Sequence, residues 1–215
     1  MVLQPKRLAW AALALAPLLF IGAVFLQRSR AQSHAALPVL LQIEPFSLVD
    51  QHGQAVALSD LRGQVWVADF IFTGCTSACP MLTSRMRSLQ DFLARREGEL
   101  RRKLPIRLVS FSVDPEVDTP ERLREYAARF GADGQRWLFL TGSLAEINRA
   151  VTGSMKIPFE KGGADTSAFD VMHGEHFVVV DGQGRIRGYF DADSEGMARI
   201  ENAVQALAAA ERGAT

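Results

Sequence analysis

The sequence predicts an α/β domain, with a mixed sheet and helices on both faces, joined to an N-terminal transmembrane helix. Three observations lead to this prediction. Apolar runs rich in β-branched and aromatic residues alternate along the chain with segments of helical periodicity. Near the C-terminus, two strand-like runs flank a glycine-containing turn, which is typical of an antiparallel hairpin. Residues 8–26 form an apolar run without a single charge.

The first half of the domain contains two short strands, a buried strand and a helix. Residues 44–63 are expected to form the short strands around a turn at His52–Gly53. Residues 65–72, VWVADFIF, suit a central strand that is buried on both faces. The segment after Pro80 is predicted to be helical, because its apolar residues recur on one stripe: Met81, Leu82, Met86, Leu89, Phe92 and Leu93.

A second buried strand is expected at residues 106–113, and Asp118–Glu121 has the composition of a helix start. That helix is expected at 118–131, followed by a strand at 137–142 and a second helix at 143–153. A polar loop is expected at 159–172, a hairpin at 176–192 and a final helix at 194–213.

Composition and charge indicate a globular domain that does not bind nucleic acid. Hydrophobic residues make up 48% of the chain, which excludes disorder as its main description. The chain is long enough to bury a full core, so its two cysteines are not needed as a staple. Residues 1–31 carry four basic residues and no acid, which leaves 20 basic and 24 acidic residues in the rest. This mildly acidic remainder does not suit a nucleic-acid partner.

The chain is expected to divide into a membrane anchor with basic flanks at 1–31, a tether at 32–43 and a folded domain at 44–215. A bilayer is crossed by about 20 apolar residues, and residues 8–26 are just long enough. The alternative is a cleaved signal peptide ending near Ser29–Ala31, although its apolar region usually has about 7–15 residues. We expect the anchor to be retained and the domain to be exported, into a compartment where disulfides persist.

The only two cysteines, Cys75 and Cys79, stand in the stretch FIFTGCTSACP, where the predicted central strand leads into a helix. Reactive groups often gather at such junctions in α/β sheets. The amides and dipole at a helix N-terminus favour a thiolate, so a lowered thiol pKa is expected there. Three interpretations are open: an inert disulfide, a redox pair, or part of a metal site. The inert disulfide is disfavoured, because so short a loop gains little from closure.

A metal site would need at least one more ligand, because two thiolates are an incomplete set. Thiolates are soft ligands that select Cu(I), zinc or iron–sulfur centres. Of the four histidines, His34 lies in the tether and His52 in an expected exposed turn. His173, at the end of the polar loop, and His176, at the start of a strand, are the candidates that remain.

Four segments of the chain, taken together, resemble the Sco/SenC family. They are FIFTGCTSACPM, FSVDPEVDTPERLREYAARFG, WLFLTG and a histidine eight residues before the aspartate of VVVD. The most specific are the T-x-C-x-x-x-C-P and D-P-x-x-D-T-P patterns, which occur here in the same chain and order. The resemblance runs from about Glu44 to the C-terminus and extends to the N-terminal anchor.

The resemblance implies a thioredoxin-like fold and a membrane-anchored copper metallochaperone that delivers copper to cytochrome c oxidase. By matching position, the copper ligands would be Cys75, Cys79 and His173, and the metal would be Cu(I), Cu(II) or both. The implied partner is the oxidase subunit that carries the copper centre. Another copper chaperone or a thiol reductase is a further candidate partner. The implied location is the bacterial inner membrane, with the domain in the periplasm. Asp114 and Asp118 match the family's acidic segment and are interpreted as loop and helix-start residues.

This chain departs from the family pattern around the histidine. The family has Asp-His-Ser or Asp-His-Thr, whereas this chain has Met172-His173-Gly174, with its nearest preceding acid at Asp170. Because a carboxylate often orients a ligand histidine, copper affinity or the preferred oxidation state would differ.

Two other activities remain open from the sequence. In a thiol–disulfide oxidoreductase, Cys75 and Cys79 would cycle between dithiol and disulfide and reduce cysteines of the oxidase or of other exported proteins. A peroxiredoxin-like peroxidase is suggested only by the residues before Cys75, and it would leave Cys79 and His173 unexplained.

Overall fold

The computed structural model describes residues 37–161, 169–170 and 176–213. Residues 37–215 form one compact unit. The expected anchor at 1–31 lies outside the described residues, and so do residues 32–36 of the tether. Within the described ranges, no helix is both long enough and apolar enough to cross a membrane.

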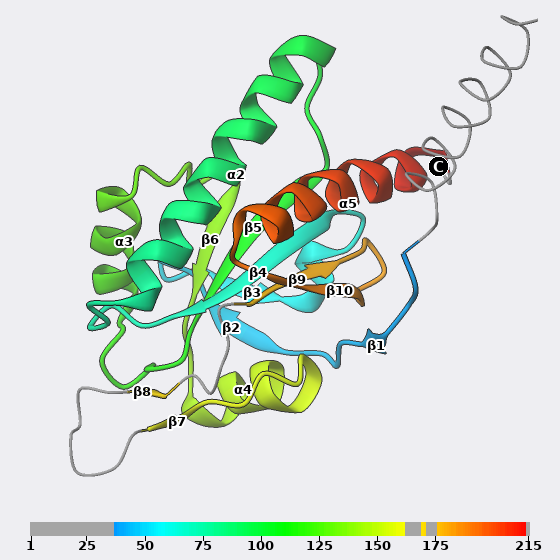
Figure 1. Cartoon of the computed structure of the whole chain (residues 1–215). Coiled ribbons are helices and arrows are strands. Elements are labelled where there is room, and N and C mark those ends of the chain that lie inside the picture. The colour runs from blue at the N-terminus through cyan, green and yellow to red at the C-terminus, as the bar shows by residue number, and fades with distance from the viewer. Residues whose placement is uncertain (1–36, 162–168, 171–175, 214–215) are drawn as a thin grey trace, which may run out of the picture. The chain divides into compact units, whose positions relative to one another are not determined.

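The centre of the domain is a six-stranded mixed sheet in the order β1-β10-β9-β4-β5-β6 (Figure 1). Strands β4, β5 and β6 are parallel, whereas β9, β10 and β1 add to the other side of β4 in antiparallel pairs. The bounds are Leu41–Gln42 for β1, Val65–Ile71 for β4, Ile106–Ser112 for β5, Trp137–Leu140 for β6, His176–Val180 for β9 and Arg185–Asp191 for β10.

Helices cover both faces of this sheet, as the sequence predicts. Figure 1 shows α2 and α5 on one face and α4 on the other. Helix α3 packs on β6 beside α2, where its Tyr126 meets the ring of Phe139. The helices are α2 (Ala78–Leu100), α3 (Pro120–Arg129), α4 (Leu144–Asn148) and α5 (Ser194–Gly213), and the π-helical turn η2 (Arg149–Ser154) continues α4.

Short elements complete the domain. Strands β2 and β3 pair around the predicted turn at His52–Gly53, and a 3-10 turn, η1, follows β3. The bounds are Ser47–Val49 for β2, Ala55–Ala57 for β3, Leu58–Leu61 for η1, Glu160–Lys161 for β7 and Phe169–Asp170 for β8.

The core is centred on β4. All seven of its residues are buried, as the apolar run predicts for a central strand. On one face, Phe111 of β5 stacks on Phe70 and receives the edge of Phe46. On the other face, Trp137 stacks on Phe139. This rigid centre holds the end of β4, where the cysteine segment begins.

Most predicted elements are confirmed, with differences at their boundaries. Helix α2 begins at Ala78, so Cys79 and Pro80 lie inside its first turn. The single helix predicted at 143–153 is divided into α4 and η2. Strand β1 lies within the range assigned to the tether and pairs with β10, so the folded part already includes Leu41–Gln42.

Candidate dithiol and metal site

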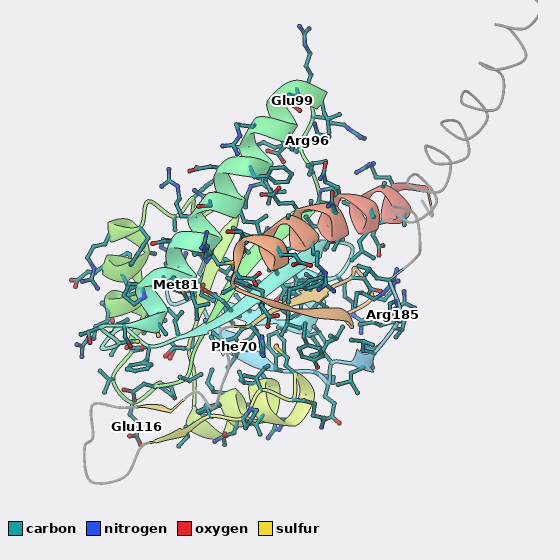
Figure 2. All side chains as sticks on the ribbon, in the orientation of Figure 1. Phe70, Met81, Arg96, Glu99, Glu116 and Arg185 are labelled. Carbon is teal, nitrogen blue, oxygen red and sulfur yellow. The ribbon has the colours of Figure 1, made fainter. Side chains whose placement is uncertain are left out.

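Both cysteines lie at the junction of β4 and α2, where the sequence predicts them. Strand β4 ends at Ile71, and the Cys75 amide donates to the Phe72 carbonyl over 3.2 Å, which turns the chain sharply. Cys79 is the second residue of α2. Phe70 on β4 and Met81 on α2, labelled in Figure 2, mark the two elements that this loop joins.

The loop brings the two cysteines into contact. The backbone amide of Cys79 donates to Cys75 Sγ over 3.3 Å, and Ser77 Oγ lies 3.9 Å from the same sulfur. Cys75 is partly exposed, whereas Cys79 is buried at 3% exposure. Neither cysteine is in a disulfide. One sulfur therefore faces solvent at a helix N-terminus, and the other lies behind it.

The two thiols differ in acidity. Partial burial opposes ionisation of Cys75, but hydrogen bonds from the Cys79 thiol, the Cys79 amide and Ser77 outweigh it and lower the pKa of Cys75. Burial raises the pKa of Cys79, and its hydrogen bond to Cys75 and the nearby charges of Cys75 and Asp69 raise that pKa further. The expected lowering of pKa is therefore confirmed for Cys75 and wrong for Cys79.

A buried carboxyl, Asp69, lies within electrostatic reach of Cys79. It stands in the middle of β4 with 0% exposure, and its Oδ1 accepts a 2.5 Å hydrogen bond from Ser110 Oγ. Ser110 in turn accepts from Trp137 Nε1 over 2.9 Å. Within the described part of the chain, Asp69 Oδ2 has no hydrogen-bond partner. Burial raises the pKa of Asp69 to about 7, and the bond from Ser110 only partly offsets the rise.

A second chain of hydrogen bonds holds the first turns of α2. Thr83 Oγ1 donates to the Cys79 carbonyl, and Tyr126 OH lies 2.8 Å from Thr83 Oγ1. Since the Thr83 proton is used on Cys79, the Tyr126 hydroxyl is the donor. Burial raises the pKa of Tyr126, so it remains a neutral donor at neutral pH. This network ties Cys79 to α3 across the helix interface.

Asp118 has a role that the sequence interpretation missed. The N-cap of α3 is Thr119, whose side chain accepts from Arg122 N, so Asp118 is not the capping residue. Asp118 is instead buried at 0% exposure and accepts hydrogen bonds from Thr73 and Ser112. The only signal for it in the sequence was its place in the D-P-x-x-D-T-P segment, which does not show what it binds.

The structure places the histidines in different environments and describes only some of them. His173, the expected third ligand, lies outside the described residues, as do its neighbours Met172 and Gly174. His176 begins β9, and its Nδ1 lies 3.0 Å from Asp191 Oδ1. His52 is exposed in its turn, as expected. Among the described residues, no group of three or more histidine, cysteine or acidic side chains could hold a metal ion.

The arrangement supports two kinds of chemistry. A partly exposed thiol of lowered pKa beside a buried thiol of raised pKa suits nucleophilic attack by Cys75 followed by closure with Cys79. The same two sulfurs are soft donors that can bind one thiophilic metal ion when both are ionised. A dithiol at the end of a central strand of a mixed α/β sheet defines a thioredoxin-like dithiol protein.

The chain belongs to the SCO1/SenC family, whose model matches residues 38–209. It is 37% identical over 150 residues to the SCO1 protein homolog of Bacillus subtilis, covering 69% of this chain and 73% of that protein. The resemblance found in the sequence is therefore confirmed.

Solved structures agree with this assignment. The structure of BsSco, a member of the Sco family of cytochrome c oxidase assembly proteins with an identified disulfide switch, has a TM-score of 0.66 and 31% identity. It covers 80% of this chain and 96% of its own. Bradyrhizobium japonicum ScoI, solved with copper bound, shares the fold with a TM-score of 0.62 at 24% identity, over 77% of this chain and 97% of its own.

Proposed function

We propose that this protein is a membrane-anchored copper metallochaperone, in which Cys75, Cys79 and His173 bind one copper ion for delivery to cytochrome c oxidase. The observation that carries the proposal is the contact of two free cysteines at the strand–helix junction, with the Cys79 amide 3.3 Å from Cys75 Sγ. Copper binding by Bradyrhizobium japonicum ScoI and the place of BsSco among oxidase assembly proteins support it.

The chemistry of the two sulfurs suits a cargo that is picked up and released. Cys75 is partly exposed and has a lowered pKa, so it is the first thiolate that an incoming Cu(I) ion meets. Cys79 must lose its proton against a raised pKa before it can bind the same ion. Copper binding therefore releases protons and tightens as pH rises. His173 would complete a set of two thiolates and one imidazole, which suits Cu(I).

The proposal includes partner and location. The receiving partner would be the oxidase subunit that carries the copper centre, and another copper chaperone or a thiol reductase would act before it. Residues 8–26 would hold the domain at the bacterial inner membrane, facing the periplasm.

Copper titration of the reduced full-length protein, against a competing Cu(I) chelator, tests the proposal. We expect one copper per chain, loss of binding in the Cys75→Ser/Cys79→Ser double variant, and affinity weakened at least about tenfold in His173→Ala. The matched control is His52→Ala, which removes an exposed histidine and should leave affinity unchanged. Stoichiometric binding that survives loss of both cysteines would overturn the proposal.

A thiol–disulfide reductase is the second candidate, favoured by the unequal acidity of the two thiols. The Cys75 thiolate would attack a disulfide of the target, forming a mixed disulfide and releasing one target thiol. Cys79, after losing its proton, would then displace the second target thiol and close the Cys75–Cys79 disulfide. The target gains two electrons, and this protein must be reduced again by an external dithiol.

The two functions separate in one assay. Reduction of a model disulfide by the reduced protein should be lost in Cys75→Ser and nearly unchanged in His173→Ala, because His173 takes no part in thiol exchange. If His173→Ala abolishes both copper binding and disulfide reduction, the reductase candidate as described here is wrong.

A further inference from the structure

The dithiol functions proposed above give no role to the acidic segment D-P-x-x-D-T-P. Its second aspartate, Asp118, is fully buried. Its carboxylate receives three donor groups. The Thr73 amide donates to Oδ2 over 3.0 Å, the Thr73 hydroxyl to Oδ1 over 2.5 Å, and the Ser112 hydroxyl to Oδ2 over 2.7 Å. Hydrogen bonds to a charged acceptor are stronger than neutral ones, so this is a firm local restraint.

The restraint joins the two strand ends that frame the dithiol. Thr73 follows β4 in the cysteine loop, and Ser112 is the last residue of β5. The pairing extends one residue past the end of β5, because the Val113 amide donates to the carbonyl of Ile71, the last residue of β4, over 2.9 Å. Met81 and Glu116, labelled in Figure 2, mark the helix that carries Cys79 and the loop that carries Asp118.

Thr73 stands inside the turn that sets the position of Cys75. The hydrogen bond from the Cys75 amide to the Phe72 carbonyl closes this turn, and Thr73 lies between the two bonded residues. It presents Cys75 Sγ to the Cys79 amide at 3.3 Å. Since Thr73 gives both its amide and its hydroxyl to Asp118, the turn cannot shift without breaking two bonds to a buried carboxylate.

We propose that Asp118, acting through Thr73, is a positioning residue that holds the sulfur of Cys75 against the amide of Cys79. In the absence of this clamp, the loop relaxes, the sulfur of Cys75 moves away from the Cys79 amide, and the 3.3 Å hydrogen bond between them is lost. The consequence for copper rests on the proposed function, whereas the effect on Cys75 itself does not.

Two matched variants test the clamp, because each removes one hydroxyl from the same carboxylate. Thr73→Val removes the hydroxyl donor on the cysteine loop and keeps the Thr73 amide donor, and Ser112→Ala removes the hydroxyl donor on β5. The readout is the rate at which iodoacetamide alkylates Cys75 at pH 7 in the reduced, copper-free full-length protein, with Cys79 resolved by mass spectrometry. Thr73→Val should slow alkylation about three- to tenfold, Thr73→Ser should restore the rate, and Ser112→Ala should stay within about twofold of wild type.

Asp118→Asn should slow alkylation at least as much as Thr73→Val, because an amide nitrogen would face donors. If Asp118→Asn does not fold, the comparison of Thr73→Val with Ser112→Ala still tests whether Asp118 positions Cys75. Equal effects of Thr73→Val and Ser112→Ala, or no effect of Thr73→Val, would overturn the inference, and so would failure of Thr73→Ser to restore the rate.

The same variants separate this inference from the proposed function. A copper titration of Thr73→Val and Ser112→Ala should show weaker binding only for Thr73→Val. If no variant and no wild-type protein binds copper, yet alkylation still depends on Thr73, the metallochaperone proposal fails and the clamp stands. If wild type binds copper while Thr73→Val alkylates like wild type, the clamp fails and the copper site stands.

Discussion

Two buried aspartates near the dithiol, Asp69 and Asp118, have the same exposure of 0% and opposite surroundings. Asp118 accepts from Thr73 and Ser112 and holds two strand ends together. The side chain that donates to Asp69 is Ser110, and Asp69 Oδ2 has no partner among the described residues. Burial therefore raises the pKa of Asp69 to about 7. Burial alone therefore does not decide whether a carboxyl acts as a structural restraint or has a raised pKa. The number of hydrogen-bond donors around the carboxyl also matters.

The largest effect is expected from Asp118→Ala, which leaves three donor groups of Thr73 and Ser112 without their acceptor. Each unsatisfied buried donor costs about 1–3 kcal/mol, so the loss of unfolding free energy should be about 3–5 kcal/mol. Urea denaturation followed by circular dichroism measures it. A loss below about 1 kcal/mol would show that Asp118 is not the restraint that its contacts indicate.

A smaller and pH-dependent effect is expected from Asp69→Asn. Because the pKa of Asp69 is raised from 3.8 to about 7 in the folded state, ionisation of this carboxyl destabilises the fold. The cost is absent below about pH 4, grows as pH rises towards about 7, and is complete above that value.

Wild type should therefore lose about 2–3 kcal/mol more than Asp69→Asn between pH 5 and pH 8. Urea denaturation of both proteins at the two pH values gives this difference. The control is Asp60→Asn, since Asp60 is an exposed carboxyl in η1. Parallel pH profiles for wild type and Asp69→Asn would contradict a carboxyl that titrates near neutrality.

The smallest of the three effects is expected from Ser110→Ala, which removes the one hydroxyl that serves Asp69 and also accepts from Trp137 Nε1. Loss of this link should destabilise the fold by about 1–2 kcal/mol and raise the pKa of Asp69 further, since the bond from Ser110 lowers it. Double variants with Asp69→Asn test the link. If the two changes are additive in unfolding free energy, Ser110 does not act through Asp69.

Sequence reasoning found most of the elements, because their patterns are local. Residues 65–72 read as a doubly buried strand, and β4 is buried throughout. The apolar stripe after Pro80 predicted α2, and four of its six members, Leu82, Met86, Leu89 and Leu93, are fully in the core. The sequence left the first residue of this helix open, and the structure places it at Ala78.

The candidate site was found only in part. Cys75 and Cys79 followed from their position between a strand and a helix, and the structure brings them together. The assignment of His173 came from family resemblance and stays a prediction. Asp69 and Asp118 were missed as contributors, because an aspartate in a strand or a loop gives no sign of what will surround it.

By itself, the sequence determined the family, the strand–helix order and the dithiol, since periodicity and short motifs act over a few residues. The tertiary structure decided that β9 would lie antiparallel beside β4, and that β1 would extend the sheet. It also decided that Asp118 would bind Thr73, 45 residues earlier in the chain. It set the unequal acidities of Cys75, Cys79 and Asp69 as well. These properties depend on burial and on partners distant in sequence, and both arise only when the chain is packed.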